Sequence, residues 1–217
     1  MTRIVAGVAG GRRLTAPPGR ETRPTSDRVR EALFASLRSE VGELEGLDVL
    51  DLYAGSGAVG CEALSRGARS VLFVESARNA VACIRRNLRE LGLAGGEVRA
   101  ADVERLVSAP ADHAYDIAFL DPPYAVSDER VRGVLSALLR HGWLVPEAVV
   151  VVERATRGGP FTWPDGFEPL RSRRYGETTL WYGLAGTEDW SSRQADRSGE
   201  EEEAACTEPS ARGRSTR

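Results

Sequence analysis

The tetrapeptide Asp121-Pro122-Pro123-Tyr124 places a carboxylate, a fixed carbonyl and an aromatic ring directly after a predicted strand, residues 115–120. An amino group on an aromatic ring is a poor nucleophile, because its lone pair is delocalised. The Asp121 side chain and the Pro122 carbonyl could accept hydrogen bonds from its two N–H groups. The two prolines fix that carbonyl in an extended direction. Tyr124 could stack on the ring, which is worth about 1–3 kcal/mol. We expect these four residues to be catalytic; the alternative is a plain strand-to-loop turn.

A second motif, LDLYAGSGAVG (50–60), predicts a strand that runs into a glycine-rich turn and then a helix. Gly55 and Gly57 would let the backbone approach a ligand closely. Through Gly60 the string also fits GxGxxG, so a nicotinamide cofactor is an alternative. Asp51 ends the strand and favours S-adenosylmethionine, because a carboxylate can face the cationic part of that molecule and would repel a pyrophosphate.

Two further acids follow neighbouring predicted strands. Glu75 ends the strand 70–75 and could accept hydrogen bonds from ribose hydroxyls, while Asp102 could accept one from an adenine amino group. Each acid could instead be a helix N-cap or a solvated loop residue. The predicted S-adenosylmethionine site comprises Asp51, Tyr53, Gly55, Ser56, Gly57, Glu75 and Asp102.

Metal and membrane sites are not expected. The two histidines and three cysteines show no metal-ligand spacing and no CxxC pair. The chain has no apolar run long enough to cross a bilayer, and its first residues lack the apolar region of a signal peptide. We expect a cytoplasmic protein with no metal and no membrane partner, and a monomer by default.

Alternating apolar runs and helical patterns predict an α/β fold with a mostly parallel sheet. The predicted strands are 48–53, 70–75, 97–101, 115–120 and 148–153, and the helices lie near 57–66, 77–92 and 128–141. A glycine-containing turn at 175–177 predicts a closing antiparallel hairpin. This pattern favours the Rossmann-like fold of class I methyltransferases, with a seven-stranded sheet.

The two ends of the chain differ from this core. Residues 1–45 form an extension with a predicted β-hairpin and a helix from about residue 26 to 41, and residues 1–30 hold seven arginines against two acids. Residues 186–217 hold eight acids against five arginines and have almost no apolar side chains, which predicts a disordered acidic tail. The methyltransferase domain would span 46–185.

The assembled motifs resemble the RsmD family, bacterial methyltransferases that form N2-methylguanine in 16S ribosomal RNA. The resemblance covers about residues 3–184. It rests on RIVAG (3–7) with residues 11–14, TRPTSDRVREALF (22–34), VLDLYAGSGAVGCEALSRGA (49–68), VLFVE (71–75), Asn87-Leu88 and FLDPPY (119–124). The chain departs from the family in Tyr53, where Phe is expected, and in the acidic tail.

The resemblance implies that the glycine-rich turn and its acids bind S-adenosylmethionine and that residues 121–124 hold the guanine amino group. It also implies that the head of the chain, the arginine-rich residues 1–30, closes the cofactor pocket or binds RNA. The arginine-rich head would in any case suit phosphate contacts. We expect RNA contacts from Arg12, Arg13, Arg20, Arg23 and Arg30, with ribosomal RNA, the small subunit or an assembly intermediate as partner.

Three alternatives remain open. An amino-methyltransferase acting on DNA adenine N6 or on a protein glutamine would use the same chemistry, although Asp121 stands where those enzymes usually have Asn. A nicotinamide oxidoreductase would lack an evident hydride-transfer partner. A non-catalytic ribosome-assembly factor could retain the fold, and the intact Asp-Pro-Pro-Tyr motif argues against it.

Overall fold

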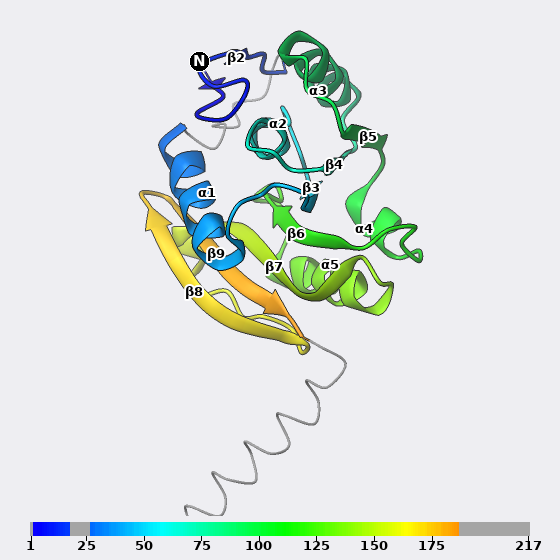
Figure 1. Ribbon diagram of the computed structural model, residues 1–217. Helices are drawn as coiled ribbons and strands as arrows, with labels where there is room; N and C mark the ends of the chain where they lie inside the picture. Colours follow the sequence, from blue (N-terminus) through cyan, green and yellow to red (C-terminus); the bar gives the residue numbers. More distant parts are fainter. Residues whose placement is uncertain (1, 18–26, 187–217) are drawn as a thin grey trace, which may run out of the picture.

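A computed structural model describes residues 2–17 and 27–186 of the chain. Its main sheet has seven strands in the order β5-β4-β3-β6-β7-β9-β8. The first five in that order are parallel, and β9 and β8 are antiparallel (Figure 1). The strands are β3 (Asp48–Leu52), β4 (Ser70–Glu75), β5 (Gly96–Ala100), β6 (Tyr115–Leu120), β7 (Leu144–Ala155), β8 (Phe167–Tyr175) and β9 (Thr178–Ala185). The predicted class I methyltransferase fold with a closing hairpin is confirmed.

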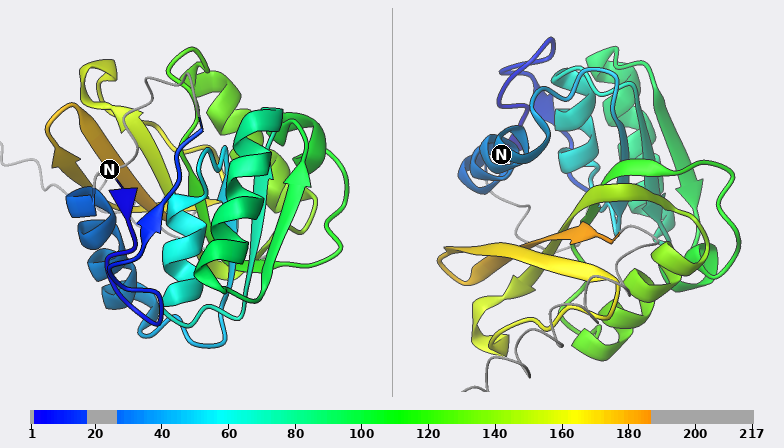
Figure 2. Two further views of the ribbon diagram at one scale, coloured as in Figure 1. Left: turned by 90° about the horizontal axis from the view of Figure 1, so that it is seen from above. Right: turned by 60° about the horizontal axis from the view of Figure 1, so that its bottom comes forward.

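Helices cover both faces of this sheet, as the views of Figures 1 and 2 show. One core joins the sheet to α1 (Asp27–Val41), α2 (Ala58–Ser65) and α3 (Arg78–Leu91). The other core joins it to α4 (Val103–Val107) and α5 (Asp128–Arg140). Both faces of β3 and of the VVVV segment of β7 are therefore buried, as the continuous apolar runs predict.

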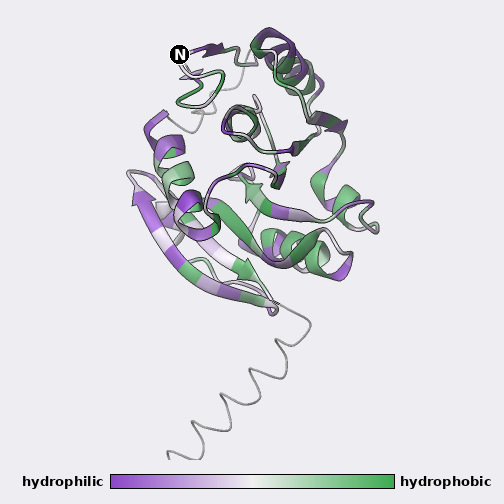
Figure 3. Ribbon diagram, viewed as in Figure 1, coloured by the Kyte–Doolittle hydropathy of each residue, from purple (hydrophilic) through white to green (hydrophobic). Residues whose placement is uncertain are grey.

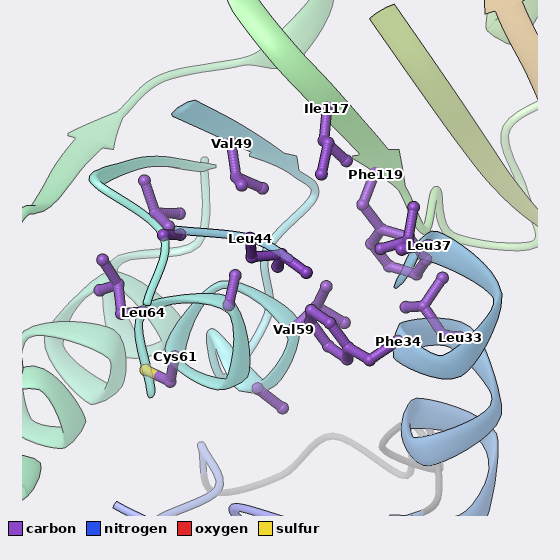
Figure 4. Close-up of a cluster of buried hydrophobic side chains, with 14 of the residues drawn as sticks. Leu33, Phe34, Leu37, Leu44, Val49, Val59, Cys61, Leu64, Ile117 and Phe119 are labelled. Atoms are coloured by element: carbon purple, nitrogen blue, oxygen red, sulfur yellow. The ribbon is translucent and has the colours of Figure 1, made fainter. Parts of the chain in front are cut away.

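Helix α1 packs through the apolar stripe that its sequence predicts. Leu33, Phe34 and Leu37 are buried and point toward Val59 of α2 and Phe119 of β6 (Figure 4). Apolar residues three and four apart lie on one helical face, so burying them fixes the orientation of α1 against the sheet.

The five-residue helix α4 was not predicted. It follows β5 and begins at Asp102, whose side chain accepts a hydrogen bond from Arg105 N at 3.0 Å. A helix of five residues is too short to show a helical period in its sequence.

The strands of the closing hairpin do not join the sheet in chain order. Strand β9 lies between β7 and β8 and pairs with both, and Val150 of β7 faces Gly183 of β9. The turn between β8 and β9 falls at Gly176, with a φ of 64°, where the sequence predicts it.

The short hairpin β1 (Thr2–Arg3) and β2 (Arg13–Leu14) packs against α2. The buried Glu62 accepts hydrogen bonds from Val5 N and Ala6 N, at 2.7 and 2.9 Å. A β-carbon at Gly7 would lie 1.7 Å from Ser65 O, so only glycine permits this approach. The motifs RIVAG and EALSRGA are thus the two sides of one contact.

The predicted tail, residues 186–217, lies outside the described part apart from Gly186, and the domain boundaries after residues 45 and 185 stay predictions. No helix in the described ranges is long and apolar enough to cross a membrane.

Candidate active site

The carboxyl ends of β3 and β6 bring the two sequence motifs together. These strands are parallel neighbours, with Leu52 beside Leu120. Directly beyond them, Asp121 N donates to Leu52 O at 3.4 Å. The Asp-Pro-Pro-Tyr segment therefore begins beside the glycine-rich turn, at the sheet edge where doubly wound folds bind ligands.

The glycine-rich turn is held in a defined shape by backbone contacts. Gly57 N donates to Ala54 O at 2.7 Å, and Gly57 begins helix α2 in the left-handed region, at a φ of 74°. A β-carbon at Gly55 would meet nothing closer than Tyr53 O at 3.9 Å. One at Gly60 would lie 2.2 Å from the Phe73 ring. Gly55 thus leaves room for a ligand, whereas Gly60 allows α2 to pack on β4.

Asp51 is a buried acid below this turn, with only 1% of its surface exposed. Its Oδ2 accepts a hydrogen bond from Gly60 N at 3.0 Å. Burial raises the pKa of its carboxyl to about 8, and the nearby negative charge of Glu75 contributes to the rise. No cation pairs with Asp51 among the described residues. A cationic ligand at this turn would supply the missing charge.

Glu75, also buried, shapes the turn from the end of β4. Its Oε2 accepts from Gly55 N at 2.9 Å, and its Oε1 accepts from Ala77 N at 2.8 Å. A carboxylate oxygen has two lone pairs, so each oxygen of Glu75 can accept more than one hydrogen bond. Asp102 is exposed and is the N-cap of α4, which the sequence allowed as its alternative role.

Tyr53 follows β3 in a strained conformation. Its φ is 60°, one of two positive values among the described non-glycine residues. Its hydroxyl is buried and has no hydrogen-bond partner within residues 2–17 and 27–186. Burial raises the Tyr53 pKa to about 12, and the charges of Glu104 and Asp102 add to the rise. Strain of this kind gathers at functional sites.

The Asp-Pro-Pro-Tyr segment has a buried half and an exposed half. Pro122 is buried, whereas Pro123 is exposed and Tyr124 is 68% exposed. Within the described ranges, Val8 and Tyr124 are the large apolar side chains that stand in solvent. Val126 N donates to Pro123 O at 2.8 Å and closes a turn around Tyr124. An exposed ring on a closed turn suits stacking on a planar ligand.

Arg154 anchors this turn, a role that the sequence did not reveal. It extends from the end of β7, with a side chain only 13% exposed, and donates through an Nη to Val126 O at 2.8 Å. The same nitrogen lies 2.7 Å from Asp128 Oδ1. The sequence did contain a signal for this role, because Arg154 is a charged residue near the end of an apolar strand, at the edge where the ligand site is predicted.

Asn87, buried on α3, joins the head to the glycine-rich turn. Its Nδ2 donates to Thr15 O at 3.0 Å and to Ser56 O at 2.9 Å, while its Oδ1 accepts from Thr15 N. The sequence contained this residue only as part of the family resemblance. The structure therefore places the residues after β2 beside the cofactor turn.

The predicted RNA-binding arginines are not all available to RNA. Arg12 is exposed and stays a predicted RNA contact, but it donates to Leu91 O at 2.6 Å and to Glu90 O and so caps the carboxyl end of α3, at the sheet edge opposite the catalytic motif. Arg30 is fully buried; it donates to Arg3 O and pairs with Asp27. A buried guanidinium cannot reach a phosphate, so we assign Arg30 to the fold.

The remaining predicted RNA-binding arginines fall into two cases. Arg13 is exposed, whereas Arg20 and Arg23 lie outside the described residues.

Within residues 2–17 and 27–186, no group of three or more His, Cys, Asp or Glu side chains could hold a metal ion.

Comparisons with known proteins show what the chain is similar to. A family model described as Conserved hypothetical protein 95 matches residues 2–183. The chain is 32% identical over 177 residues to Ribosomal RNA small subunit methyltransferase D of Haemophilus influenzae, covering 80% of this chain and 89% of that protein. It is 33% identical over 179 residues to the protein of the same name from Escherichia coli K12, covering 81% and 85%. The solved structure of yhhF from Escherichia coli matches with a TM-score of 0.75 and 29% identity, covering 85% of this chain and 98% of that one.

Proposed function

Because the chain belongs to the RsmD family of methyltransferases, we propose that it transfers a methyl group from S-adenosylmethionine to the exocyclic N2 of a guanine in 16S ribosomal RNA. The other products are S-adenosylhomocysteine and one proton from the amino group. The main support is the adjacency of two sites. The Asp121–Tyr124 segment begins beside a glycine-rich turn that has a buried acid without a cationic partner in the described structure. Hydrogen-bond acceptors for an amino group and a site for a cationic cofactor thus lie at the same edge of the sheet.

The residues around the turn fit S-adenosylmethionine, which supplies a methyl group activated on a sulfonium when bound. Gly55 leaves open space at the turn, and Asp51 offers a buried carboxylate to the cationic end. Glu75 would accept hydrogen bonds from ribose hydroxyls, and Asp102 would accept one from the adenine amino group. Tyr53 and Ser56 complete the proposed binding set.

The target amine would be held by the segment after β6. The Asp121 carboxylate and the Pro122 carbonyl accept its two N–H groups and direct its lone pair away from the ring plane. Burial of Pro122 fixes this carbonyl, and Tyr124 provides a face for the base to stack on. Positioning of this kind can lower the activation free energy of a bimolecular step by roughly 7–11 kcal/mol.

A guanine in folded RNA would have to leave its stack to reach Tyr124. We propose that the chain acts in the cytoplasm, as a monomer, on the small ribosomal subunit or on an intermediate in its assembly. Arg12, Arg13, Arg20 and Arg23 remain proposed phosphate contacts, and Arg12 and Arg13 are exposed.

The test is a labelled-methyl assay on small ribosomal subunits that lack this modification, followed by nucleoside analysis of the RNA. We expect N2-methylguanosine. N6-methyladenine in DNA or methylglutamine in protein would establish the corresponding alternative, and binding of a nicotinamide cofactor in place of S-adenosylmethionine would refute the cofactor assignment. A chain that binds the subunit and transfers no methyl group would be an assembly factor.

A further inference from the structure

The carboxyl edge of the sheet continues past the catalytic segment into the closing hairpin. Leu120 of β6 faces Val152 of β7, and β7 extends to Ala155, which faces Thr178 of β9. Thr178 in turn faces Tyr175, the last residue of β8. The β8–β9 turn therefore lies at the same edge as Asp121. In the left panel of Figure 2, the loops that follow β6 and β7 project from the same side of the molecule.

This turn is firmly held. Thr156, just after β7, donates through its backbone N to Glu177 O at 2.8 Å and through its hydroxyl to Gly176 O at 3.2 Å. Arg174 Nε donates to Gly176 O at 3.2 Å. The segment after β7 and the β8–β9 turn thus form one ordered platform.

Three exposed arginines occupy this platform, and we call them the rim arginines: Arg157, Arg173 and Arg174. Figure 3 shows the resulting hydrophilic end of β8. None of the three forms an ion pair within the described ranges. By contrast, Arg154 on β7 pairs with Asp128, and Arg171 on β8 pairs with Glu40. The inward arginines serve the fold, whereas the rim arginines leave their charge in solvent.

The position of the rim arginines suits a nucleic acid strand. Three strand spacings separate β6 from β8, which amounts to about 14 Å along the edge. A base held at Tyr124 would therefore have its neighbouring phosphates within reach of the platform. Guanidinium groups bind phosphate in bidentate fashion. Arg12 points to the opposite edge and Arg30 is buried, so these head arginines cannot take this role.

We propose that Arg157, Arg173 and Arg174 bind phosphates of the RNA strand next to the target base, and that they set the orientation of that strand across the sheet edge. The inference rests on the proposed function, because it assumes that residues 121–124 receive a base from RNA. An acidic protein surface on the ribosome is the competing partner, and the test distinguishes the two.

The test compares two double variants of the full chain with equal change of charge. Arg173→Gln with Arg174→Gln alters the rim, and Arg89→Gln with Arg140→Gln alters two exposed arginines in the last turns of α3 and α5. Both helices end at the opposite edge: Arg12 donates to Leu91 O at the end of α3, and His141 O at the end of α5 accepts from Ala111 N just before β6. Binding of unmethylated 16S ribosomal RNA is measured from low to physiological salt, together with methyl transfer to unmethylated small subunits and affinity for S-adenosylmethionine.

We expect the rim variant to raise KM for subunits at least tenfold, with little change in kcat and unchanged affinity for S-adenosylmethionine. The slope of log affinity for RNA against log salt should fall by about 1–2, since each phosphate contact contributes about 0.7–0.9. The Arg89 and Arg140 double variant should behave like the wild type. Adding Arg157→Gln to the rim variant should lower the slope further.

Equal RNA affinity and equal salt slope in the two double variants would overturn the proposal. So would a rim variant that loses binding to whole subunits and keeps it for naked RNA, because its partner would then be a ribosomal protein. Failure of the proposed function has a different signature: the wild type itself transfers no methyl group to RNA. The salt slopes still test the rim arginines in that case.

Discussion

Two buried acids at opposite ends of strand β3 have opposite electrostatic environments. Asp48, at the amino end, accepts hydrogen bonds from Arg69 Nε at 2.9 Å and Ser70 Oγ at 2.7 Å, and it also contacts His113. The Arg69 hydrogen bond is the main reason that the Asp48 pKa lies well below its usual range. Asp51, at the carboxyl end, has the Gly60 amide, and burial raises its pKa to about 8.

The difference separates a structural edge of the sheet from a functional one. At the amino edge, the buried acid Asp48 has a cationic partner within the chain, Arg69. At the carboxyl edge, Asp51 lacks a cationic partner in the described structure and Tyr124 stands in solvent. Groups whose partners are supplied by the fold stabilise it, whereas groups left without partners are available to a ligand.

The largest effect should come from the carboxyl edge. Asp121→Ala should lower methyl transfer by about 100- to 1,000-fold, because one preorganised hydrogen-bonding partner of the reacting group is lost. Affinity for S-adenosylmethionine and the melting temperature should stay near wild type. Asp112→Ala is the matched control, since this exposed acid precedes the same strand at the opposite edge. Similar activities in the two variants would contradict the division into two edges.

Asp48→Asn tests the structural edge. The substitution keeps the shape of the side chain and weakens its charge-assisted hydrogen bonds, so we expect unfolding free energy at pH 7 to fall by about 1.5–3 kcal/mol. Denaturant unfolding measures this change. Transfer activity of the folded variant should be unaltered, and a variant with wild-type stability but impaired transfer would reverse the assignment.

Asp51→Asn should have the opposite profile. The amide oxygen can still accept from Gly60 N, and the variant removes a buried charge, so stability above pH 8 should be equal to wild type or greater by about 1–3 kcal/mol. Affinity for S-adenosylmethionine should fall about tenfold or more, equivalent to roughly 1.4 kcal/mol or more. Calorimetric titration gives the affinity, and an unchanged value would remove Asp51 from the cofactor site.

The smallest predicted effect is a pH dependence of cofactor binding. In the free protein the raised pKa keeps Asp51 mostly protonated at pH 7, and a bound cation would favour its charged form. Affinity should therefore rise with pH through the window that ends near pH 8. A pKa of about 8 gives an increase of about fivefold between pH 7 and 8. Asp51→Asn should abolish the increase, and a flat wild-type profile would count against the raised pKa.

The same acid should influence the stability of the free protein. Because the folded pKa of Asp51 lies above the unfolded value of 3.8, its neutral form stabilises the fold below that value, and the contribution is lost as pH rises toward about 8. Asp48 has the reverse sign, since its lowered pKa contributes stability above its unfolded value that is lost in acid. The two ends of one strand thus respond to pH in opposite directions.

Much of the fold followed from local patterns in the sequence. The strands 70–75 and 115–120 match the prediction in both bounds, and the turn at residues 175–177 links the closing hairpin as expected. The adjacency of residues 121–124 and the glycine-rich turn also followed, because carboxyl ends of parallel strands meet at one edge. Helix α4 and the insertion of β9 between β7 and β8 did not follow, since neither has a local pattern that specifies it.

The sequence by itself determined the residue types, the strand ends and therefore the edge at which the chemistry is placed. Only the tertiary structure decided which charged side chains are buried or paired within the chain. Arg30 is buried and donates to a carbonyl 27 positions away, and Arg171 pairs with Glu40 across 131 positions, whereas Arg173 stays exposed. A guanidinium has the same composition in all three places, and its role depends on partners that are distant in the chain and become neighbours only when the chain folds.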